Sequence, residues 1–403
     1  MITLEAAKQR VFGRVAAGSP TSVPTAEALH LVTAAPVVSS EAVPPFDNTS
    51  VDGYALRAEE TEHAPLRLRV IGELPAGVAP DRPVGPGEAI RIMTGAPIPE
   101  GATGVVMVED TESIGPDVVV KVPVRTGESI RLTGSDVQPG AVVFEAGTRL
   151  TPAHLGVLAS IGQAEVQVYP RLRVGVLSTG DELVTDGSPL QPGQIRESNL
   201  ELLLGLLREA DCEPVDFGVV ADDADVLSAA LRDATERCDA LLTSGGVSMG
   251  DYDLVKVMLD KLGEMDWMQI AIRPAKPFAF GLLPGPDKTV PVFGLPGNPV
   301  SSLVSFELFA RPALRKMMGH TDIERPSFAA IADAGLRRPR GDEKVHLIRV
   351  HGTFGDDGRL HVSATGAQGS HQLANSAAAN ALAVVPDGPG IEPGGEVQVM
   401  FFA

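Results

Sequence analysis

The stretch from Arg171 to Val184, "RLRVGVLSTGDELV", decides the fold that we expect for this chain. It opens with a short apolar run, which is typical of a buried β-strand. A cluster of Gly, Asp and Glu follows at once, at residues 180–182. In α/β proteins, ligands bind where parallel strands end in this way. The segment therefore predicts one strand of an α/β sheet with a polar loop at its carboxyl end.

Strands and helices continue to alternate from Arg171 to Gly319. Predicted strands cover residues 171–178, 213–220, 238–246, 265–274 and 289–297, and predicted helices cover 198–210, 224–237, 253–263 and 298–319. Ser198 followed by Glu201 predicts a capping box at the start of the first of these helices. The alternation is typical of a mostly parallel sheet that carries helices on both faces.

The flanking parts of the chain have a different pattern. Short Val and Ile runs between Leu66 and Ile130 are broken by Gly and Pro, which predicts a small β domain. Thr151 and Pro152 then form the expected start of a helix. Short strands return after Arg325 and predict a further β module. A length of 403 residues fits two to four domains of this kind.

Composition excludes several classes of function. The net charge of −19 argues against a nucleic-acid binder, because such surfaces need clustered Lys and Arg. No run of about 18 apolar residues is present, so we expect no membrane span. The first residues lack the basic start of a signal peptide, and Cys212 and Cys238 lack metal-binding spacing. We therefore expect a cytoplasmic protein with two buried thiols.

Polar residues with special backbone or charge properties collect after five predicted strands, at one edge of the sheet. Each such loop alone is ordinary turn chemistry, but five at one edge favour a ligand site. The candidate residues of these loops are Thr179, Gly180, Asp181, Glu182, Asp222, Ser244, Gly245, Gly246, Ser248, Asp253, Arg273, Lys276, Pro296, Gly297, Asn298, Pro299 and Ser301.

The charges at this edge are of two kinds. Glycine backbone, a predicted helix start after Asn298 with free N–H groups, and the pair Arg273 and Lys276 all suit an oxyanion. Glu182, Asp222 and Asp253 are carboxylates, which tolerate a neighbouring phosphate only when a divalent ion lies between them. We therefore expect Mg²⁺ at the three carboxylates. Neither a Walker A sequence nor a GxGxxG loop is present.

The segment from Val43 to Leu56, "VPPFDNTSVDGYAL", is rich in proline and turn-forming pairs. Its spacing fits neither a helix nor an alternating strand. On local grounds it is a surface loop, and nothing in it names a ligand.

Eight motifs together resemble the MoeA family, the molybdopterin molybdenumtransferases, which are similar to the C-terminal part of gephyrin. They occur in the family's order and span nearly the whole chain: "PPFDNTSVDGYAL", "RIMTGAPIPEGATGVVMVED", "GVLSTGDEL", "GQIRESN", "TSGGVSMGDYD", "IRPAKPFAFG", "GLPGNPVSS" and "GAQGSH". The resemblance implies four domains. These are an elongated discontinuous domain (1–45 and 140–170), a β domain (46–139), a MogA-like α/β domain (171–320) and a C-terminal β-barrel (321–403).

The resemblance also implies a reaction and an assembly. Molybdate would be inserted into adenylylated molybdopterin (MPT-AMP) with release of AMP, in a Mg²⁺-dependent step. The family forms homodimers whose active site combines the first half of one subunit with the α/β domain of the other. A MogA-type adenylyltransferase and molybdoenzyme delivery factors would be its partner proteins.

The resemblance assigns roles to matching positions. Glu182, Asp222 and Asp253 would position Mg²⁺ and pyrophosphate, whereas Arg273, Lys276 and Ser301 would bind molybdate. The other matching catalytic or binding positions are Asp52, Thr94, Asp136, Ser198, Asn199 and Ser370. Lys344 and Arg349 would add basic charge near Ser370. One departure is Arg273-Pro274-Ala275-Lys276, where many members have Lys-Pro-Gly-Lys.

Two alternatives stay open from the sequence. The α/β domain is similar to the domain that adenylylates molybdopterin, so this preceding step is a second enzymatic hypothesis. The gephyrin resemblance allows a third, a non-catalytic dimeric scaffold.

Overall fold

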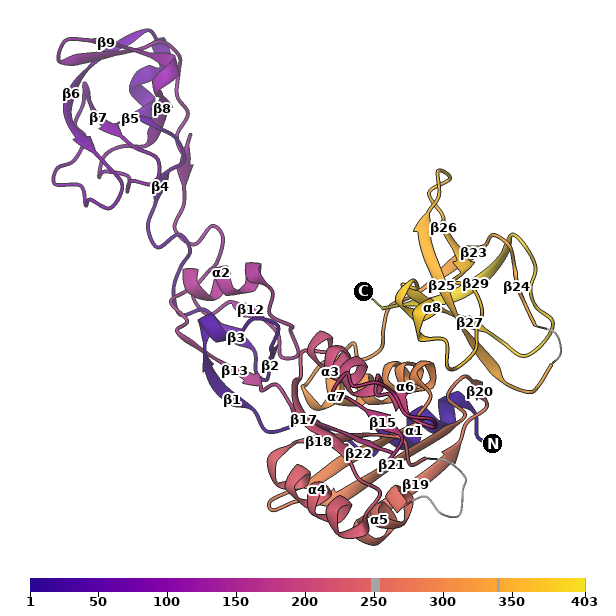
Figure 1. The fold of residues 1–403 in the computed structure, drawn as a ribbon. Coiled ribbons are helices and arrows are strands. Elements are labelled where there is room, and N and C mark those ends of the chain that lie inside the picture. The colour runs from indigo at the N-terminus through magenta and orange to yellow at the C-terminus, as the bar shows by residue number, and fades with distance from the viewer. Residues whose placement is uncertain (248–253, 339–340, 403) are drawn as a thin grey trace. The chain divides into compact units, whose positions relative to one another are not determined.

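The computed structural model describes residues 1–247, 254–338 and 341–402 (Figure 1). The chain divides into two compact units. The first comprises residues 1–21, 30–34 and 168–403, and the second comprises residues 22–29 and 35–167. The division into four domains remains a prediction.

A six-stranded mixed sheet lies at the centre of the first unit. Its strands, in spatial order, are β17 (Glu213–Val220), β14 (Arg173–Thr179), β18 (Ala240–Ser244), β22 (Thr289–Leu295), β21 (Pro277–Pro284) and β19 (Glu264–Gln269). Five strands run in the same direction, and β21 alone runs antiparallel to its neighbours β22 and β19. The expected α/β domain is thus confirmed. Strand β21 was not predicted, because the prolines at its two ends are typical of a loop.

Helices cover both faces of this sheet, as predicted (Figure 1). Alternate side chains of β14 explain the arrangement: Val174 and Val176 join one apolar cluster, and Leu177 joins another. The first cluster includes α1 (Leu4–Phe12), α3 (Asn199–Glu209), α6 (Pro299–Ser305) and α7 (Arg311–Met317), and the second includes α4 (Ala224–Arg237) and α5 (Leu254–Leu262).

The helix predicted over residues 298–319 is not continuous. A π-helical segment, Phe306–Ala310, separates α6 from α7. Pro312 supplies a physical reason, since it has no N–H to donate to the preceding turn. Within this segment, buried Glu307 accepts hydrogen bonds from Arg325 at 3.0 and 3.1 Å.

The capping box expected at the start of α3 is wrong. The side chain of Ser198 makes no capping hydrogen bond there. Glu197 takes this place, because its carboxylate accepts from the N–H groups of Asn199 at 3.2 Å and Leu200 at 2.8 Å. A carboxylate one residue earlier can reach two N–H groups of the first turn and also suits the helix dipole.

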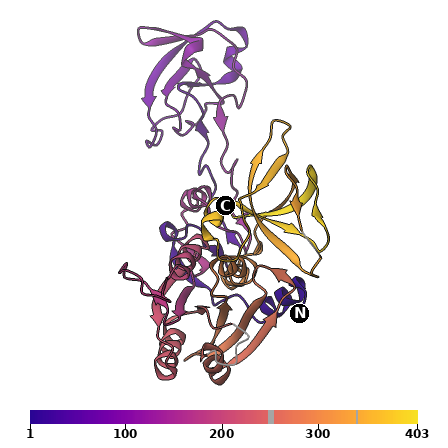
Figure 2. The same cartoon turned by 45° about the vertical axis from the view of Figure 1, so that its right-hand side comes forward.

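A closed five-stranded barrel forms the C-terminal part of the first unit (Figure 2). Its strands are β25 (Val345–Phe354), β26 (Leu360–Ala364), β23 (Ser327–Ala332), β29 (Gly395–Phe401) and β27 (Ala381–Val385), with β27 pairing to β25 to close it. The strand predicted over 265–274 is split: β20 (Ile272–Arg273) leaves the α/β sheet and pairs with β25.

The second unit contains the predicted small β domain. Its six-stranded sheet has the order β8 (Gly104–Met107), β5 (Gly53–Leu56), β7 (Glu88–Ile92), β6 (Leu66–Leu74), β10 (Asp117–Val120) and β9 (Thr111–Ile114). Gly53 is required, since a Cβ there would lie 1.8 Å from the carbonyl oxygen of Val106. Part of the supposed loop 43–56 is therefore a buried strand. Helix α2 (Pro152–Ser160) begins after Thr151, as predicted.

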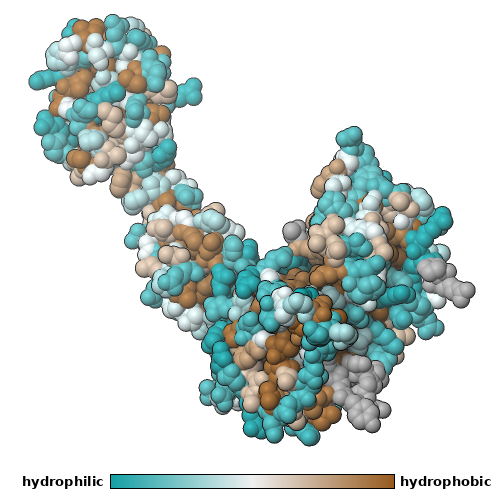
Figure 3. Space-filling model, in the orientation of Figure 1, coloured by the Kyte–Doolittle hydropathy of each residue, from teal (hydrophilic) through white to brown (hydrophobic). Residues whose placement is uncertain are grey.

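The face of the molecule drawn in Figure 3 is largely polar. Apolar side chains are dispersed among the polar ones. Among the described residues, no helix is long and apolar enough to cross a membrane.

Candidate functional site

A cavity of about 930 Å³ lies at the carboxyl ends of the parallel strands. It is lined by twelve of the residues predicted from the sequence: Thr179, Gly180, Glu182, Ser198, Asn199, Asp222, Ser244, Gly245, Gly246, Gly297, Asn298 and Pro299. The sheet brings them together because strands β14, β17, β18 and β22 run in the same direction and end at one edge.

Sequence reasoning missed eight further residues of the lining: Ser178, Leu183, Ile195, Arg196, Glu197, Leu254, Val255 and His371. For two of them a signal was present. Glu197 precedes a predicted helix start, where a carboxylate is favoured. His371 adjoins Ser370 in the "GAQGSH" motif.

Two side chains fix the loops around this cavity. The amide nitrogen of Asn199 donates to the hydroxyl of Ser244 and to the carbonyl of Gly297, both at 2.8 Å. Glu197 accepts from the hydroxyl of Ser178 at 2.8 Å. Asn199 is only 6% exposed, and its Oδ1 has no hydrogen-bond partner among the described residues. That oxygen is therefore an acceptor held in place beside the cavity.

The glycines of this edge are structurally required. Gly245 and Gly246 have φ values of 91° and 71°, in the left-handed region that favours glycine. A Cβ on Gly246 would lie 2.3 Å from the Cβ of Val255. Backbone of the loop thus reaches the cavity where no larger residue would fit.

The expectation of free N–H groups at the start of α6 is wrong in part. Pro299 has no N–H, and the N–H of Val300 donates to the carbonyl of Ser370 at 3.2 Å. The contact instead joins a loop of the C-terminal barrel region to the α/β domain, which places His371 on the cavity wall.

Two of the three predicted metal ligands, Glu182 and Asp222, line the cavity. The third, Asp253, lies outside the described residues, as does Ser248. Asp181 does not line the cavity, but its carboxylate accepts from the N–H of Asp222 at 3.4 Å. Within the described ranges, no group of three or more acidic, His or Cys side chains could hold a metal ion.

The predicted molybdate residues are not part of the cavity lining. Arg273 pairs with His346 in the register of β20 and β25, and Ser301 is buried in α6 at 5% exposure. Lys276 is exposed, and its backbone carbonyl accepts from Ile270 at 2.8 Å. Pro296 is likewise outside the lining, and its carbonyl accepts from the hydroxyl of Ser302. Ala275, in the Arg273–Lys276 motif, has a φ of 73°, in the left-handed region that favours glycine.

Arg349 lies beside the loop of Ser370, as expected, but its side chain is buried. It is 1% exposed, and its guanidinium donates to the carbonyls of Ala367, Gly369 and Gln372. Burial lowers the pKa of this group. Arg349 therefore shapes the loop that carries Ser370 and does not present its charge to a ligand. Lys344 lies 3.5 Å from the carboxylate of Asp342.

Two of the three predicted residues of the second unit are paired with each other. Asp52 accepts from the N–H of Thr94 at 2.7 Å and from its hydroxyl at 2.8 Å. These bonds, the backbone one first, lower the pKa of Asp52. The N–H of Asp136 donates to the carbonyl of Val43 at 2.9 Å, at the start of the same segment.

A second pair of the same kind was not predicted. Asp47 accepts from the N–H and the hydroxyl of Thr133, both at 2.7 Å. The backbone bond is the main reason that the pKa of Asp47 is also lowered.

Comparison with known proteins covers the chain in three parts. The description "MoeA N-terminal region (domain I and II)" matches residues 2–162, "Probable molybdopterin binding domain" matches 175–316, and "MoeA C-terminal region (domain IV)" matches 329–402.

Whole-length relatives agree with these matches. A molybdopterin molybdenumtransferase 2 of Mycobacterium tuberculosis is 40% identical over 91% of both chains. A molybdopterin molybdenumtransferase of Haemophilus influenzae is 38% identical over 98% of this chain and 97% of its own. The crystal structure of a molybdopterin biosynthesis MoeA protein from Pyrococcus horikoshii superposes with a TM-score of 0.82 at 31% identity. That superposition covers 100% of this chain and 99% of the other.

Proposed function

This chain belongs to the MoeA family and acts in molybdenum cofactor biosynthesis, and we propose that it inserts molybdate into MPT-AMP with release of AMP. The supporting observation is the cavity at the strand ends, where three carboxylates, three glycines with positive φ and a fixed amide meet. A ligand with both a pyrophosphate and polar ring atoms suits that combination.

The carboxylates fit a Mg²⁺ site. Glu182 and Asp222 supply the hard oxygen ligands that Mg²⁺ prefers, and Asp253 is the third ligand of the proposal. A bound Mg²⁺ would neutralise charge on the anhydride of MPT-AMP. The chain's own residues bind and orient the substrate. Asn199 offers its Oδ1 to a donor of the ligand, and the 245–246 backbone allows a phosphate to approach closely.

Binding of molybdate is assigned to Arg273, Lys276 and Ser301. This rests on the family motif and on charge, because a guanidinium can bind an oxyanion through two N–H groups. Pro296 and Pro299 would shape the approach from the loop before α6.

A homodimer with a shared active site completes the proposal. Asp52, Thr94 and Asp136 of one subunit would act on substrate in the α/β cavity of the other. The support is that Asp52 is an exposed carboxylate held in one position by two hydrogen bonds. We propose the cytoplasm as its location, and a MogA-type adenylyltransferase and molybdoenzyme delivery factors as its partners.

The direct test supplies purified full-length protein with MPT-AMP, molybdate and Mg²⁺. We expect AMP release and cofactor that activates a cofactor-free molybdoenzyme, both lost when molybdate is omitted or Mg²⁺ is chelated. Binding of MPT-AMP without AMP release would contradict the transferase and favour a scaffold. Incorporation of AMP from labelled ATP into molybdopterin would instead support the adenylyltransferase alternative.

A further inference from the structure

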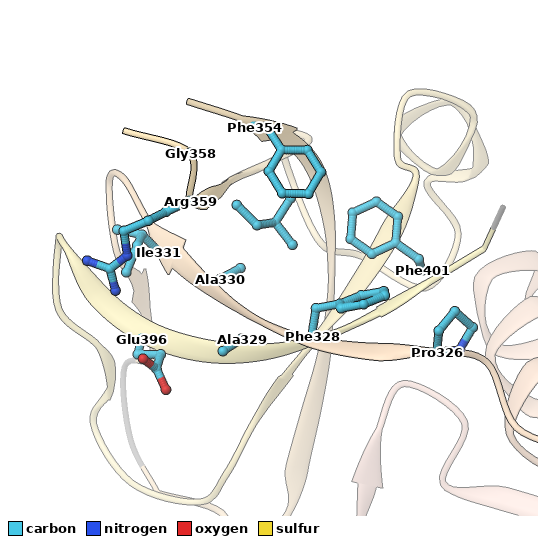
Figure 4. Close-up of a pocket in the computed structure, with 11 residues that line it drawn as sticks. Pro326, Phe328, Ala329, Ala330, Ile331, Phe354, Gly358, Arg359, Glu396 and Phe401 are labelled. Atoms are coloured by element: carbon cyan, nitrogen blue, oxygen red, sulfur yellow. The ribbon is translucent and has the colours of Figure 1, made fainter. Parts of the chain in front are cut away.

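A second, largely apolar cavity of about 540 Å³ lies on the C-terminal barrel (Figure 4). We call it the barrel groove. It shares no lining residue with the α/β cavity. Phe328, Phe354 and Phe401 line it from three different strands. Phe328 is 51% exposed and Phe354 is 79% exposed, which is unusual for side chains of this size.

The groove exists because β23 begins four residues before its pairing with the parallel strand β26, which itself begins at Leu360. Strands β23 and β26 pair only at Ile331 with His361 and at Ala332 with Val362. Towards the start of both strands no further pairing follows. The residues on either side of the gap, 328–331 and 358–360, are the ones that line the groove.

The backbone of β23 turns unpaired groups toward this gap. The carbonyls of Pro326 and Ala332 accept from residues 401 and 394 at 3.2 and 2.8 Å, so even-numbered residues of β23 bond toward β29. The N–H of Asp333 donates to Val362 of β26 at 3.2 Å, so odd-numbered residues face the other way. The N–H and carbonyl of Ala329 therefore point into the groove. Ala329 is exposed, and within the described residues no strand pairs with that side of it.

Side chains at the two ends of the groove differ in character. Figure 4 shows the rings of Phe328, Phe354 and Phe401 around one end, with Arg359 and Glu396 at the other. The rings of Phe328 and Phe401 meet edge to face, with centroids 5.9 Å apart. Glu396 has no ion-pair partner in the part of the chain that the structure describes. Its charge, on a chain of net charge −19, is complementary to a basic residue.

We propose that an extended segment of a partner protein binds in the barrel groove as an added β-strand along the unpaired edge at the start of β23. An unpaired strand edge beside apolar pockets is the arrangement that proteins use for strand addition. The segment would place apolar side chains on the three phenylalanines and a Lys or Arg beside Glu396. Residues 328–331 give room for about four residues, since a strand rises about 3.3 Å per residue.

The test measures binding of a labelled peptide, Lys-Val-Phe-Val-Lys, to the full-length protein by fluorescence anisotropy. Lysines at both ends bring one of them to Glu396 in either strand direction. We expect saturable binding and slower hydrogen exchange of the amides of Ser327 and Ala329, which face the groove, when the peptide is present. Phe354→Ser should weaken binding about tenfold, as loss of an aromatic anchor does. Phe46→Ser, the same change at an exposed phenylalanine of the other unit, should leave binding unchanged.

A second peptide isolates the backbone contribution. Methylation of its alternate amide nitrogens removes the donors that strand addition needs and leaves the side chains in place. Equal binding of both peptides, or unchanged exchange at residues 327 and 329, would overturn the proposal. Absence of binding by the first peptide would also overturn it. Sedimentation of the protein alone tests for another occupant: self-association that Phe354→Ser abolishes would show that a second copy of this chain fills the groove.

Discussion

Asp47 and Asp52 of the second unit each accept two hydrogen bonds from one threonine. In the α/β cavity, by contrast, the carboxylate of Glu182 accepts no hydrogen bond from the described residues. The first two carboxylates have their pKa lowered by these bonds. These hydrogen bonds fix the orientation of both carboxylates. Glu182 lines a cavity and keeps its oxygens available to a ligand or an ion.

The difference separates two uses of an acidic residue. A carboxylate that accepts an N–H and a hydroxyl from one residue is oriented, and part of its capacity to bind is already used. A carboxylate without such donors is suited to bind a metal ion, which needs unshared oxygen lone pairs. Four experiments test this distinction, in order of decreasing expected effect.

The largest effect is expected for Glu182→Gln. An amide of the same shape cannot supply an anionic ligand, so the rate of AMP release should fall about 100-fold or more. The assay is AMP release at saturating MPT-AMP and molybdate, titrated with Mg²⁺. Glu201→Gln, at an exposed position of α3, serves as the control and should keep the full rate. A normal Mg²⁺ titration of the Glu182 variant would remove it from the metal site.

A smaller effect is expected when the two fixed aspartates are compared. Asp52→Asn should lower the rate of molybdate insertion about tenfold, because a hydrogen bond to a charged group is worth more than one to a neutral group. Asp47→Asn makes the same substitution in an equivalent Asp–Thr pair, and it should leave the rate of molybdate insertion unchanged. Equal rates for the two variants would return Asp52 to a structural role.

Glu197 differs from Glu182, since it lines the cavity and is also fixed by three donors. Glu197→Gln loses part of the helix cap, and we expect the free energy of unfolding to fall by about 1 kcal/mol. We expect KM for MPT-AMP to rise severalfold as the loop shifts, with the Mg²⁺ titration unaltered. Urea denaturation and steady-state kinetics measure the two effects. A changed Mg²⁺ requirement would show that Glu197 acts on the ion itself.

The smallest effect is a shift in ionisation. Thr94→Val removes the hydroxyl bond but keeps the backbone N–H, so the pKa of Asp52 should rise toward its ordinary value of about 3.9. A lowered pKa stabilises the fold above the unfolded value and loses that contribution as pH falls through the folded value. The variant should therefore protonate Asp52 at a higher pH than the wild type, with no change at neutral pH.

Carboxyl ¹³C NMR titration follows this shift directly. Thr133→Val is the matched control and should move the pKa of Asp47 alone. An unchanged Asp52 titration in the Thr94 variant would mean that the hydroxyl contributes nothing to the pair.

Most of the α/β cavity could be predicted because its signals are local. An apolar run that ends in Gly, Asp or Ser identifies a strand and its loop without any tertiary knowledge. The rule that parallel strands end at one edge then brings Thr179, Ser244 and Asn298 together. The structure has all three on the cavity wall.

The features that were missed depend on contacts far along the chain. Asp47 and Thr133 are 86 positions apart, and neither has a local pattern that points to the other. Residues 272–273 continue an apolar run, yet they pair with β25 of the barrel, which no short-range rule could indicate. Ser198 fits the capping pattern, but Glu197 caps the helix instead, because its longer side chain reaches two N–H groups.

The path of the chain between the two units has a practical consequence for limited proteolysis. The chain passes from one unit to the other four times, after residues 21, 29, 34 and 167. Helix α1 begins the chain, yet Ala7 and Val11 are fully buried in the same apolar cluster as the sheet that follows residue 168. A single protease cut within residues 35–167 would therefore yield two fragments that each keep part of one core. They should comigrate in native gels and separate only in denaturant.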